Sequence, residues 1–227
     1  MQLHLFSTPG EPFLNDILSV ARQLLDGIPD PLVVYLPAAA QERHFVRETK
    51  CAFRGLADVR AIKPEIHPID IMRQILDRAS LLYIPGGNTY LAAQRLHSAG
   101  LMDDIRMRIL DGLPLVAFSA GTVLCGYDIL TTNDSNDCGC RTFNGLDLAS
   151  YNFNVHYPES DDEACRVRDD HLYTYTTKHQ RAVLALEDGA YVFADTDHIG
   201  VIKGTVWQIY NHKKERFYET GRHPHPS

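Results

Sequence analysis

The chain lacks an excess of basic residues. It has 22 Lys and Arg against 29 Asp and Glu among 227 residues, which gives a formal net charge of −7. No stretch gathers basic side chains into a face that could contact phosphates, as binding to a nucleic acid requires. The composition therefore argues against nucleic acid as a partner and favours a small molecule.

Long apolar segments and a cysteine framework are also missing. The sequence contains no run of about 18 apolar residues, the length that a membrane-spanning helix needs. The first ten residues, MQLHLFSTPG, have neither the charged start nor the long apolar middle of a secretory signal. The five cysteines are odd in number and unevenly spaced, which does not suit a disulfide framework. We therefore expect a cytoplasmic protein without membrane contact. Its oligomeric state stays open, with a homo-oligomer as one possibility.

Apolar strand-like runs alternate with helical patterns along most of the chain. The runs LHLF (3–6), PLVVYLP (31–37), SLLYIPGGN (80–88) and LPLVAFSAG (113–121) each lead into a helical stretch. Such alternation predicts an α/β fold with a doubly wound, mostly parallel sheet of the flavodoxin type. From about Ala182 the sequence becomes strand-rich, which predicts an antiparallel C-terminal edge.

The domain organisation follows from length and composition. With 44% hydrophobic residues, the chain can bury one sizeable core. It shows neither an internal repeat nor a low-complexity linker. We expect a single α/β domain over residues 1–220 and a flexible tail over 221–227.

Ser119 stands where a buried strand runs directly into a helix. In an open α/β sheet the carboxyl ends of the strands form the ligand crevice, and Ser119 lies at such an end. The small Ala120 and Gly121 allow the sharp turn of a nucleophile elbow, although Ala117 replaces the first Gly of the usual G-x-S-x-G. The Ala120 amide, at the start of the helix, could stabilise an oxyanion formed at Ser119. The alternative interpretation is a serine that only caps the helix.

Two further segments fit the same crevice. Gly86, Gly87 and Asn88 form a flexible turn that could offer a second oxyanion donor, while Asn88 could also cap the next helix. His156 ends the apolar run YNFNVHYP, where a strand would place it at the crevice as a general base. A buried, hydrogen-bonded core histidine is the alternative.

Four motifs, PGGNTY (85–90), FSAG (118–121), TTND (131–134) and NFNVHY (152–157), resemble in their order and spacing the serine peptidase family of dipeptidase E, or aspartyl dipeptidase. Cyanophycinase is related to that family. The resemblance implies a fold similar to the class I glutamine amidotransferase domain. It also implies a serine-type peptidase that uses no cofactor and acts on small peptides, with Ser119 as nucleophile and His156 as base.

The acidic partner of the histidine has two candidates. The resemblance implicates Asp134 of TTND, and a second acidic position of the family falls on Asp188 of LEDG (186–189), with Glu187 beside it. At that second position the family has Glu, so the carboxylate of Asp188 is one methylene shorter. Either Asp134 or Asp188 could orient the imidazole, so the choice stays open.

The substrate is predicted less specifically. Recognition of an N-terminal Asp would call for an arginine fork, for which Arg166 and Arg168 in DDEACRVRDDHL are the candidates. The five acidic residues of that stretch equally suit a solvated helix. The alternatives are a cyanophycinase-like hydrolase of β-aspartyl peptides and a non-catalytic ligand-binding member of the same fold. A glutamine amidotransferase would need Cys in place of Ser119. Cys138 and Cys140 lack a second ligand pair, so we expect no metal.

Overall fold

The structure is a computed structural model that describes residues 1–12, 14–39, 44–159 and 163–220. Its main sheet has seven strands in the order β3-β2-β4-β5-β1-β8-β9. The strands are β1 (Leu3–Phe6), β2 (Leu32–Tyr35), β3 (Asp58–Ala61), β4 (Leu81–Ile84), β5 (Leu115–Phe118), β8 (Tyr191–Ala194) and β9 (Ile199–Lys203). The first five strands are parallel, whereas β8 and β9 are antiparallel additions at one edge. The predicted fold class and antiparallel edge are confirmed.

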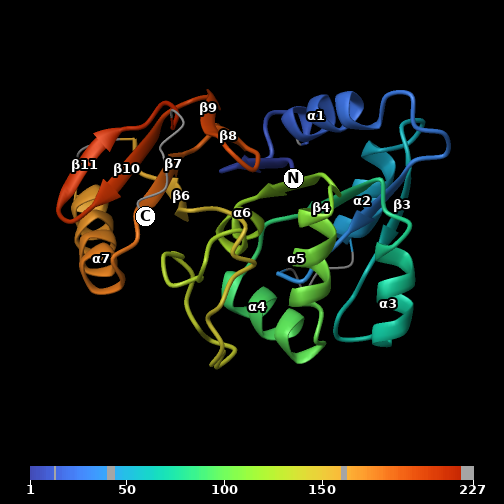
Figure 1. Cartoon of the computed structure of the whole chain (residues 1–227), viewed down its shortest axis with the longest axis horizontal. Helices are drawn as coiled ribbons and strands as arrows, with labels where there is room; N and C mark the ends of the chain where they lie inside the picture. The colour runs from blue at the N-terminus through green and yellow to red at the C-terminus, as the bar shows by residue number, and fades with distance from the viewer. Residues whose placement is uncertain (13, 40–43, 160–162, 221–227) are drawn as a thin grey trace.

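Helices cover both faces of this sheet (Figure 1). Two helices, α1 (Asn15–Leu25) and α2 (His44–Ala52), pack on the face that contains Tyr35 and Tyr83. The opposite face is covered by α3 (Ile69–Leu76), α4 (Thr89–Ser98), α5 (Met102–Leu110) and the short α6 (Ala120–Leu124). Apolar side chains recur at helical spacing along α1, and Ile17, Ala21 and Leu25 are buried.

A second sheet lies beside the first, at the left of Figure 1, with strand order β11-β10-β7-β6. It consists of β6 (Asn152–Tyr157), β7 (Val183–Glu187), β10 (Val206–Tyr210) and β11 (Lys213–Arg216), and α7 (Glu163–His179) packs on it. The C-terminal strands are therefore shared between two sheets. A strand-rich sequence does not reveal this division, because alternation of apolar residues does not identify the pairing partner of a strand.

Apolar residues of both sheets join in one core that includes Leu5, Ala117, Leu184 and Val206. This continuity supports one domain over residues 1–220, which stays a prediction. The expected tail over 221–227 lies outside the described residues.

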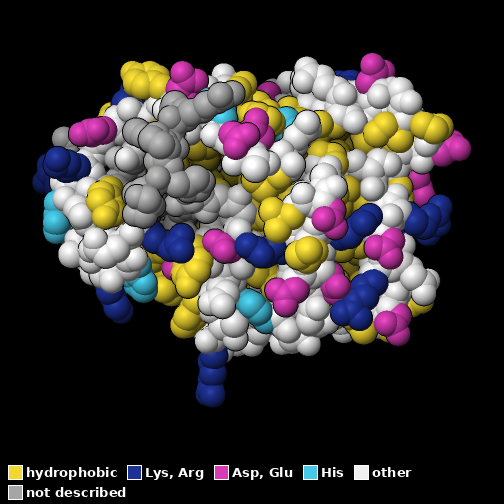
Figure 2. Space-filling view, in the orientation of Figure 1, with side chains coloured by type: hydrophobic (Ala, Val, Ile, Leu, Met, Phe, Trp, Pro, Cys, Tyr) yellow, Lys and Arg dark blue, Asp and Glu magenta, His cyan; other side chains and the backbone are white. Residues whose placement is uncertain are grey.

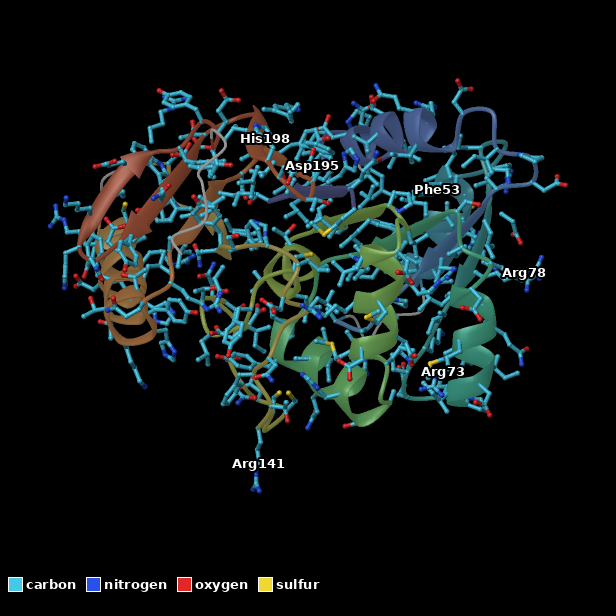
Figure 3. All side chains as sticks on the ribbon, viewed as in Figure 1. Phe53, Arg73, Arg78, Arg141, Asp195 and His198 are labelled. Carbon is cyan, nitrogen blue, oxygen red and sulfur yellow. The ribbon has the colours of Figure 1, made fainter. Side chains whose placement is uncertain are left out.

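The visible surface in Figure 2 carries acidic and basic side chains interspersed, with both signs over the same elements. Phe53, labelled in Figure 3, is fully buried at the end of α2, where its ring lies 6.1 Å from that of Tyr83. Arg141, also labelled there, points away from the body of the molecule. Among the described residues, every helix is too short or too polar to span a membrane.

Candidate active site

Ser119 lies on a sharp turn between β5 and α6. Its backbone has φ 52° and ψ −119°, a conformation that is strained for a residue with a side chain and recurs at functional sites. Gly121 permits this turn, because a Cβ at that position would lie 2.3 Å from the carbonyl oxygen of Ile84. The predicted elbow geometry is therefore present at Ser119.

His156 faces Ser119 from the second sheet. Its Nε2 lies 3.0 Å from Ser119 Oγ, and its Nδ1 lies 2.7 Å from Asp188 Oδ1. His156 has a positive φ of 53°, at a register irregularity of β6 between Asn154 and Tyr157. Such a bulge re-aims a side chain. Here it turns the imidazole toward Ser119.

Asp188 occupies the turn directly after β7. Because β6 and β7 are parallel neighbours, their carboxyl ends meet, and Asp188 lies beside His156. The histidine and aspartate side chains are 45% and 58% exposed, so the pair opens to solvent. A carboxylate on Nδ1 leaves Nε2 free to accept a proton from the serine, the arrangement used in serine hydrolases.

The carboxylate of Asp134 lies at the start of α4. One of its carboxylate oxygens, Oδ2, accepts hydrogen bonds from the amide of Thr89 (2.7 Å), the hydroxyl of Thr89 (2.6 Å) and the hydroxyl of Thr132 (3.0 Å). Thr89 is the first residue of α4, so Asp134 anchors the start of that helix, where a negative charge is favourable. Glu187 accepts a hydrogen bond from the indole of Trp207. Of the candidate carboxylates, the structure brings Asp188 to His156.

Ser7 links the histidine and the aspartate to the main sheet. The hydroxyl oxygen of Ser7 accepts a hydrogen bond from the backbone amide of His156 at 2.9 Å. The same hydroxyl lies 3.3 Å from both Asp188 Oδ1 and the carbonyl oxygen of Leu186, and donates toward them. Ser7 is fully buried. It follows β1, whose Phe6 is in register with Phe118 of β5, and this pairing places Ser7 close to the elbow.

The adjacent Thr8 adds a further hydrogen bond between the end of β1 and the turn that carries Asp188. Its hydroxyl oxygen accepts from the amide of Gly189 at 3.0 Å. Sequence reasoning missed both Ser7 and Thr8. The sequence could have indicated both residues, because they are polar and directly follow a buried strand. That is the segment where an open sheet places its ligand crevice.

The turn after β4 passes against the elbow. A Cβ at Gly86 would lie 3.0 Å from the Cβ of Ser119, and a Cβ at Gly87, where φ is +128°, would lie 2.2 Å from the carbonyl oxygen of Ala39. Asn88 caps α4, because its side-chain oxygen accepts a hydrogen bond from the Leu91 amide at 2.9 Å. The capping role expected for Asn88 is thus seen. Ala120 is the first residue of α6, next to Ser119.

The two arginines proposed for substrate recognition lie on α7. Arg166 is exposed. The guanidinium of Arg168 donates to Asn154 Oδ1 at 3.1 Å and to the carbonyl oxygen of Val155 at 3.5 Å, and burial lowers its pKa. Arg168 is therefore engaged with β6, two residues before the histidine.

A cavity of about 290 Å³ opens beside Ser119, close to the lower end of the roughly 300–1,000 Å³ that is typical of small-molecule sites. Neither Arg166 nor Arg168 is among the described residues that line it. The described lining consists of Pro9, Tyr35, Phe45, Thr49, Tyr83, Pro85, Gly86, Gly87, Phe118, Ser119 and His156.

A serine on an elbow, a histidine in contact with its hydroxyl and a carboxylate behind the histidine are the geometry of a serine hydrolase. Residues 5–202 match the sequence profile of peptidase family S51, and the chain belongs to that family. The family expected from the four motifs is confirmed.

Individual relatives agree with this assignment. Over 125 residues the chain is 30% identical to peptidase E of Haemophilus influenzae, covering 55% of this chain and 57% of the relative. Over 131 residues it is 34% identical to a Drosophila melanogaster protein named "Probable alpha-aspartyl dipeptidase", covering 56% and 55%. The matches thus span a little over half the length of these two relatives.

The crystal structure of a peptidase from an acI-B1 actinobacterium superimposes with a TM-score of 0.72 at 15% identity, covering 96% of this chain and 93% of the other. This likeness extends the agreement in fold to nearly the whole chain.

Proposed function

We propose that this protein is a serine-type peptidase that cleaves short peptides, dipeptides foremost. The observation that carries the proposal is the chain of contacts from Ser119 through His156 to Asp188, with distances of 3.0 and 2.7 Å. Relatives named peptidase E and alpha-aspartyl dipeptidase support a peptide as the substrate.

Each side chain has a distinct task in this mechanism. Ser119 Oγ attacks the scissile carbonyl carbon while His156 Nε2 takes the hydroxyl proton. His156 returns that proton to the leaving amine, and water then hydrolyses the acyl-enzyme by the same route. Asp188 holds the imidazole in the required tautomer and stabilises its cation.

Backbone amides of Ala120 and Gly87 are the proposed donors to the oxyanion. Ala120 begins α6 directly after the nucleophile, and the turn at Gly86 and Gly87 lies against the elbow. Fixed donors aimed at the developing negative charge are a large contribution to catalysis of acyl transfer. No cofactor is required by this scheme, and we propose that the enzyme works in the cytoplasm on small peptides.

The test combines active-site labelling with hydrolysis. The wild-type chain should react with a fluorophosphonate at Ser119 and should cleave members of a dipeptide panel that includes Asp-Ala and Ala-Ala. Ser119→Ala should lose both reactions, with hydrolysis falling roughly 10³-fold or more. Ser98→Ala, an exposed serine at the end of α4, is the matched control and should behave as wild type.

Two results would contradict the proposal. One is turnover close to wild type in Ser119→Ala, which would exclude Ser119 as the nucleophile. The other is a wild-type chain that binds dipeptides without labelling or hydrolysis, which would identify a ligand-binding member of the same fold.

A further inference from the structure

Two thiols lie on one tight turn in the loop that follows Asp134. Cys138 and Cys140 are separated only by Gly139. Gly139 has a φ of +68°, a left-handed conformation that glycine adopts without strain and that turns the chain. Cys138 is partly exposed, whereas Cys140 is buried, at 3% exposed. The turn therefore carries one accessible thiol beside one protected thiol.

The side chain of Asn136 holds this turn together. Its oxygen accepts hydrogen bonds from the Cys140 amide at 2.8 Å and from the Cys138 thiol at 3.7 Å. Its nitrogen donates to the carbonyl oxygen of Cys140 at 2.9 Å. Burial raises the pKa of the Cys140 thiol, and the nearby Cys138 adds to this rise. The two cysteines are thus held close to each other by the same asparagine.

The geometry of the turn suits a disulfide bond. Residues joined by a disulfide have Cα atoms about 4.4–6.8 Å apart. Consecutive Cα atoms are about 3.8 Å apart, so two residues on either side of one glycine in a turn fall within this range. A Cβ at Gly139 would meet no described atom within 4 Å. The outer side of the turn is therefore open to a small reagent.

We propose that Cys138 and Cys140 are a redox-active thiol pair that reacts with low-molecular-weight disulfides. The Cys138 thiolate attacks one sulfur of the small disulfide, whose S–S bond breaks to release a first small thiolate. The Cys140 thiolate then attacks the Cys138 sulfur and releases the second. The two protons of the cysteines pass to the two leaving thiolates. The protein pair is oxidised to a disulfide, and the small disulfide is reduced to two thiols.

This bond would be reversible rather than structural. A disulfide that spans a single residue closes a small ring, which strains it, and strained disulfides are the readily reduced, regulatory ones. The reverse reaction, in which a small thiol attacks the protein disulfide, then restores Cys138 and Cys140. This separates the pair from a disulfide framework, which the odd number and spacing of the cysteines argue against.

Oxidation would remove hydrogen bonds that shape the loop. The Cys138 thiol donates to Asn136, and the Cys140 thiol donates to the carbonyl oxygen of Thr142 at 3.2 Å. A disulfide has no S–H group, so both acceptors lose their donor. The loop around the turn would therefore rearrange when the disulfide forms.

The same loop contacts α4 next to the proposed oxyanion donor. The Asn88 side chain donates to the carbonyl oxygen of Ser135 at 2.9 Å, and the Gln94 side chain donates to that of Cys138 at 3.2 Å. Asn88 directly follows Gly87 in the chain. We therefore expect oxidation to lower kcat, an effect that rests on the peptidase function proposed above.

The first experiment detects the disulfide directly. Because Cys51 is exposed, Cys51→Ser is used to remove its thiol. The reduced protein is treated with glutathione disulfide, alkylated and digested, and its peptides are weighed by mass spectrometry. Cys138 and Cys140 should be joined to each other without bound glutathione, and excess reduced glutathione should restore two alkylated thiols. Two thiols that stay alkylatable, a lasting glutathione adduct on Cys138, or a disulfide that reduced glutathione leaves intact would each overturn the proposal.

Single variants test the order of the two steps, each made together with Cys51→Ser. Cys140→Ser should stop at a mixed disulfide between Cys138 and glutathione, because the second thiol is missing. Cys138→Ser should leave the buried Cys140 unmodified over the same time. If Cys140 reacts in Cys138→Ser as fast as Cys138 reacts in Cys140→Ser, the assignment of Cys138 as the attacking thiol is wrong.

Hydrolysis before and after oxidation tests the link to α4. In the Cys51→Ser protein kcat should fall roughly two- to tenfold, the scale of one lost hydrogen bond, and should recover with reduced glutathione. The protein with both Cys51→Ser and Cys138→Ser should keep the same kcat through this treatment. An oxidised protein with undiminished kcat would overturn the link. If the reduced protein neither hydrolyses dipeptides nor reacts with fluorophosphonate, the peptidase function fails, and the peptide masses still decide on the thiol pair.

Discussion

The amide nitrogen of His156 lies 2.9 Å from the hydroxyl oxygen of Ser7, a residue 149 positions earlier in the chain. Through this bond the end of β1 fixes the backbone of β6 at the point where the histidine leaves it. The same hydroxyl lies 3.3 Å from Asp188 Oδ1. One buried serine, which is not among the described residues that line the cavity, thus positions both partners of the proposed nucleophile.

Removal of this hydroxyl should therefore slow the chemical step. Ser7→Ala leaves the His156 amide without its acceptor, and loss of a buried hydrogen bond of about 1–3 kcal/mol corresponds to roughly ten- to a hundredfold in kcat. KM should change little, because Ser7 does not line the cavity. The check is steady-state kinetics together with the rate of fluorophosphonate labelling.

The control for Ser7→Ala is Ser19→Ala, which removes an exposed hydroxyl from α1 and should match wild type in both measurements. A Ser7→Ala protein that is labelled as fast as wild type, even if it melts at a lower temperature, would show that Ser7 contributes only to stability.

Asp188→Asn should impair hydrolysis far more than Asp134→Asn. An amide behind the imidazole can stabilise the wrong histidine tautomer, and the corresponding change in a serine protease lowers kcat about 10⁴-fold. Asp134→Asn should lower kcat less than tenfold, since Asp134 contacts Thr89 and Thr132 rather than the histidine. Single-turnover hydrolysis of the best dipeptide measures both. Similar, mild losses in the two variants would remove Asp188 from its proposed role.

Asp134→Asn should instead destabilise the fold. Its carboxylate accepts from three donors at the start of α4, and hydrogen bonds to a charged group contribute about 1.5–3 kcal/mol. The asparagine retains one acceptor oxygen, so we expect a decrease of about 1–2 kcal/mol in the free energy of unfolding, measured by urea titration. Asp137→Asn, on an exposed side chain of the same loop, is the matched control. Equal unfolding free energies for wild type and Asp134→Asn would refute this anchoring role.

His4 should make the fold sensitive to acid. Burial in β1 lowers the pKa of His4 from 6.5 to about 4, so the unfolded chain takes up this proton at a higher pH than the folded chain. The stabilising contribution is therefore complete above pH 6.5 and is lost as the pH falls toward 4. Between pH 7 and pH 5 the loss amounts to about 2 kcal/mol in the free energy of unfolding.

A His4→Phe variant isolates this effect. The new ring would lie beside Phe193, whose ring is 5.2 Å from that of His4, and would have no proton to bind. Urea titrations at pH 5 and pH 7 should show a smaller difference in unfolding free energy for the variant than for wild type. The same difference in both proteins would assign the acid sensitivity to other groups.

Local patterns predicted the parallel strands well. The run at 3–6 coincides with β1, and the run at 31–37 contains β2 (Leu32–Tyr35). The helical stretch expected after the run at 31–37 is observed as α2 from His44 to Ala52, with 40–43 outside the described residues. Strands buried on both faces give long apolar runs, which are readable without knowing their neighbours.

The elbow was predictable for a similar reason, because it is a local feature of one strand, one serine and two small residues. The choice between Asp134 and Asp188 was not, since both follow plausible turns and only pairing of β6 with β7 brings Asp188 to the histidine. Ser7 was missed because its partners are distant in sequence. The cavity beside Ser119 also had a visible signal, because Tyr35, Tyr83 and Phe118 are aromatic residues at or near the ends of three buried strands.

The proposed catalytic residues are divided between the two sheets. Hydrolysis therefore requires that both sheets have folded and docked against each other. Ser119 leaves the main sheet, whereas His156 and Asp188 leave the second sheet, so a partly folded chain holds a serine with no base beside it. Such an intermediate would not hydrolyse peptides. The single tryptophan, Trp207, lies in β10 of the second sheet, so its fluorescence follows the formation of that sheet. In a refolding experiment, any interval between the return of this fluorescence and the return of hydrolysis measures the time that the two sheets need to dock.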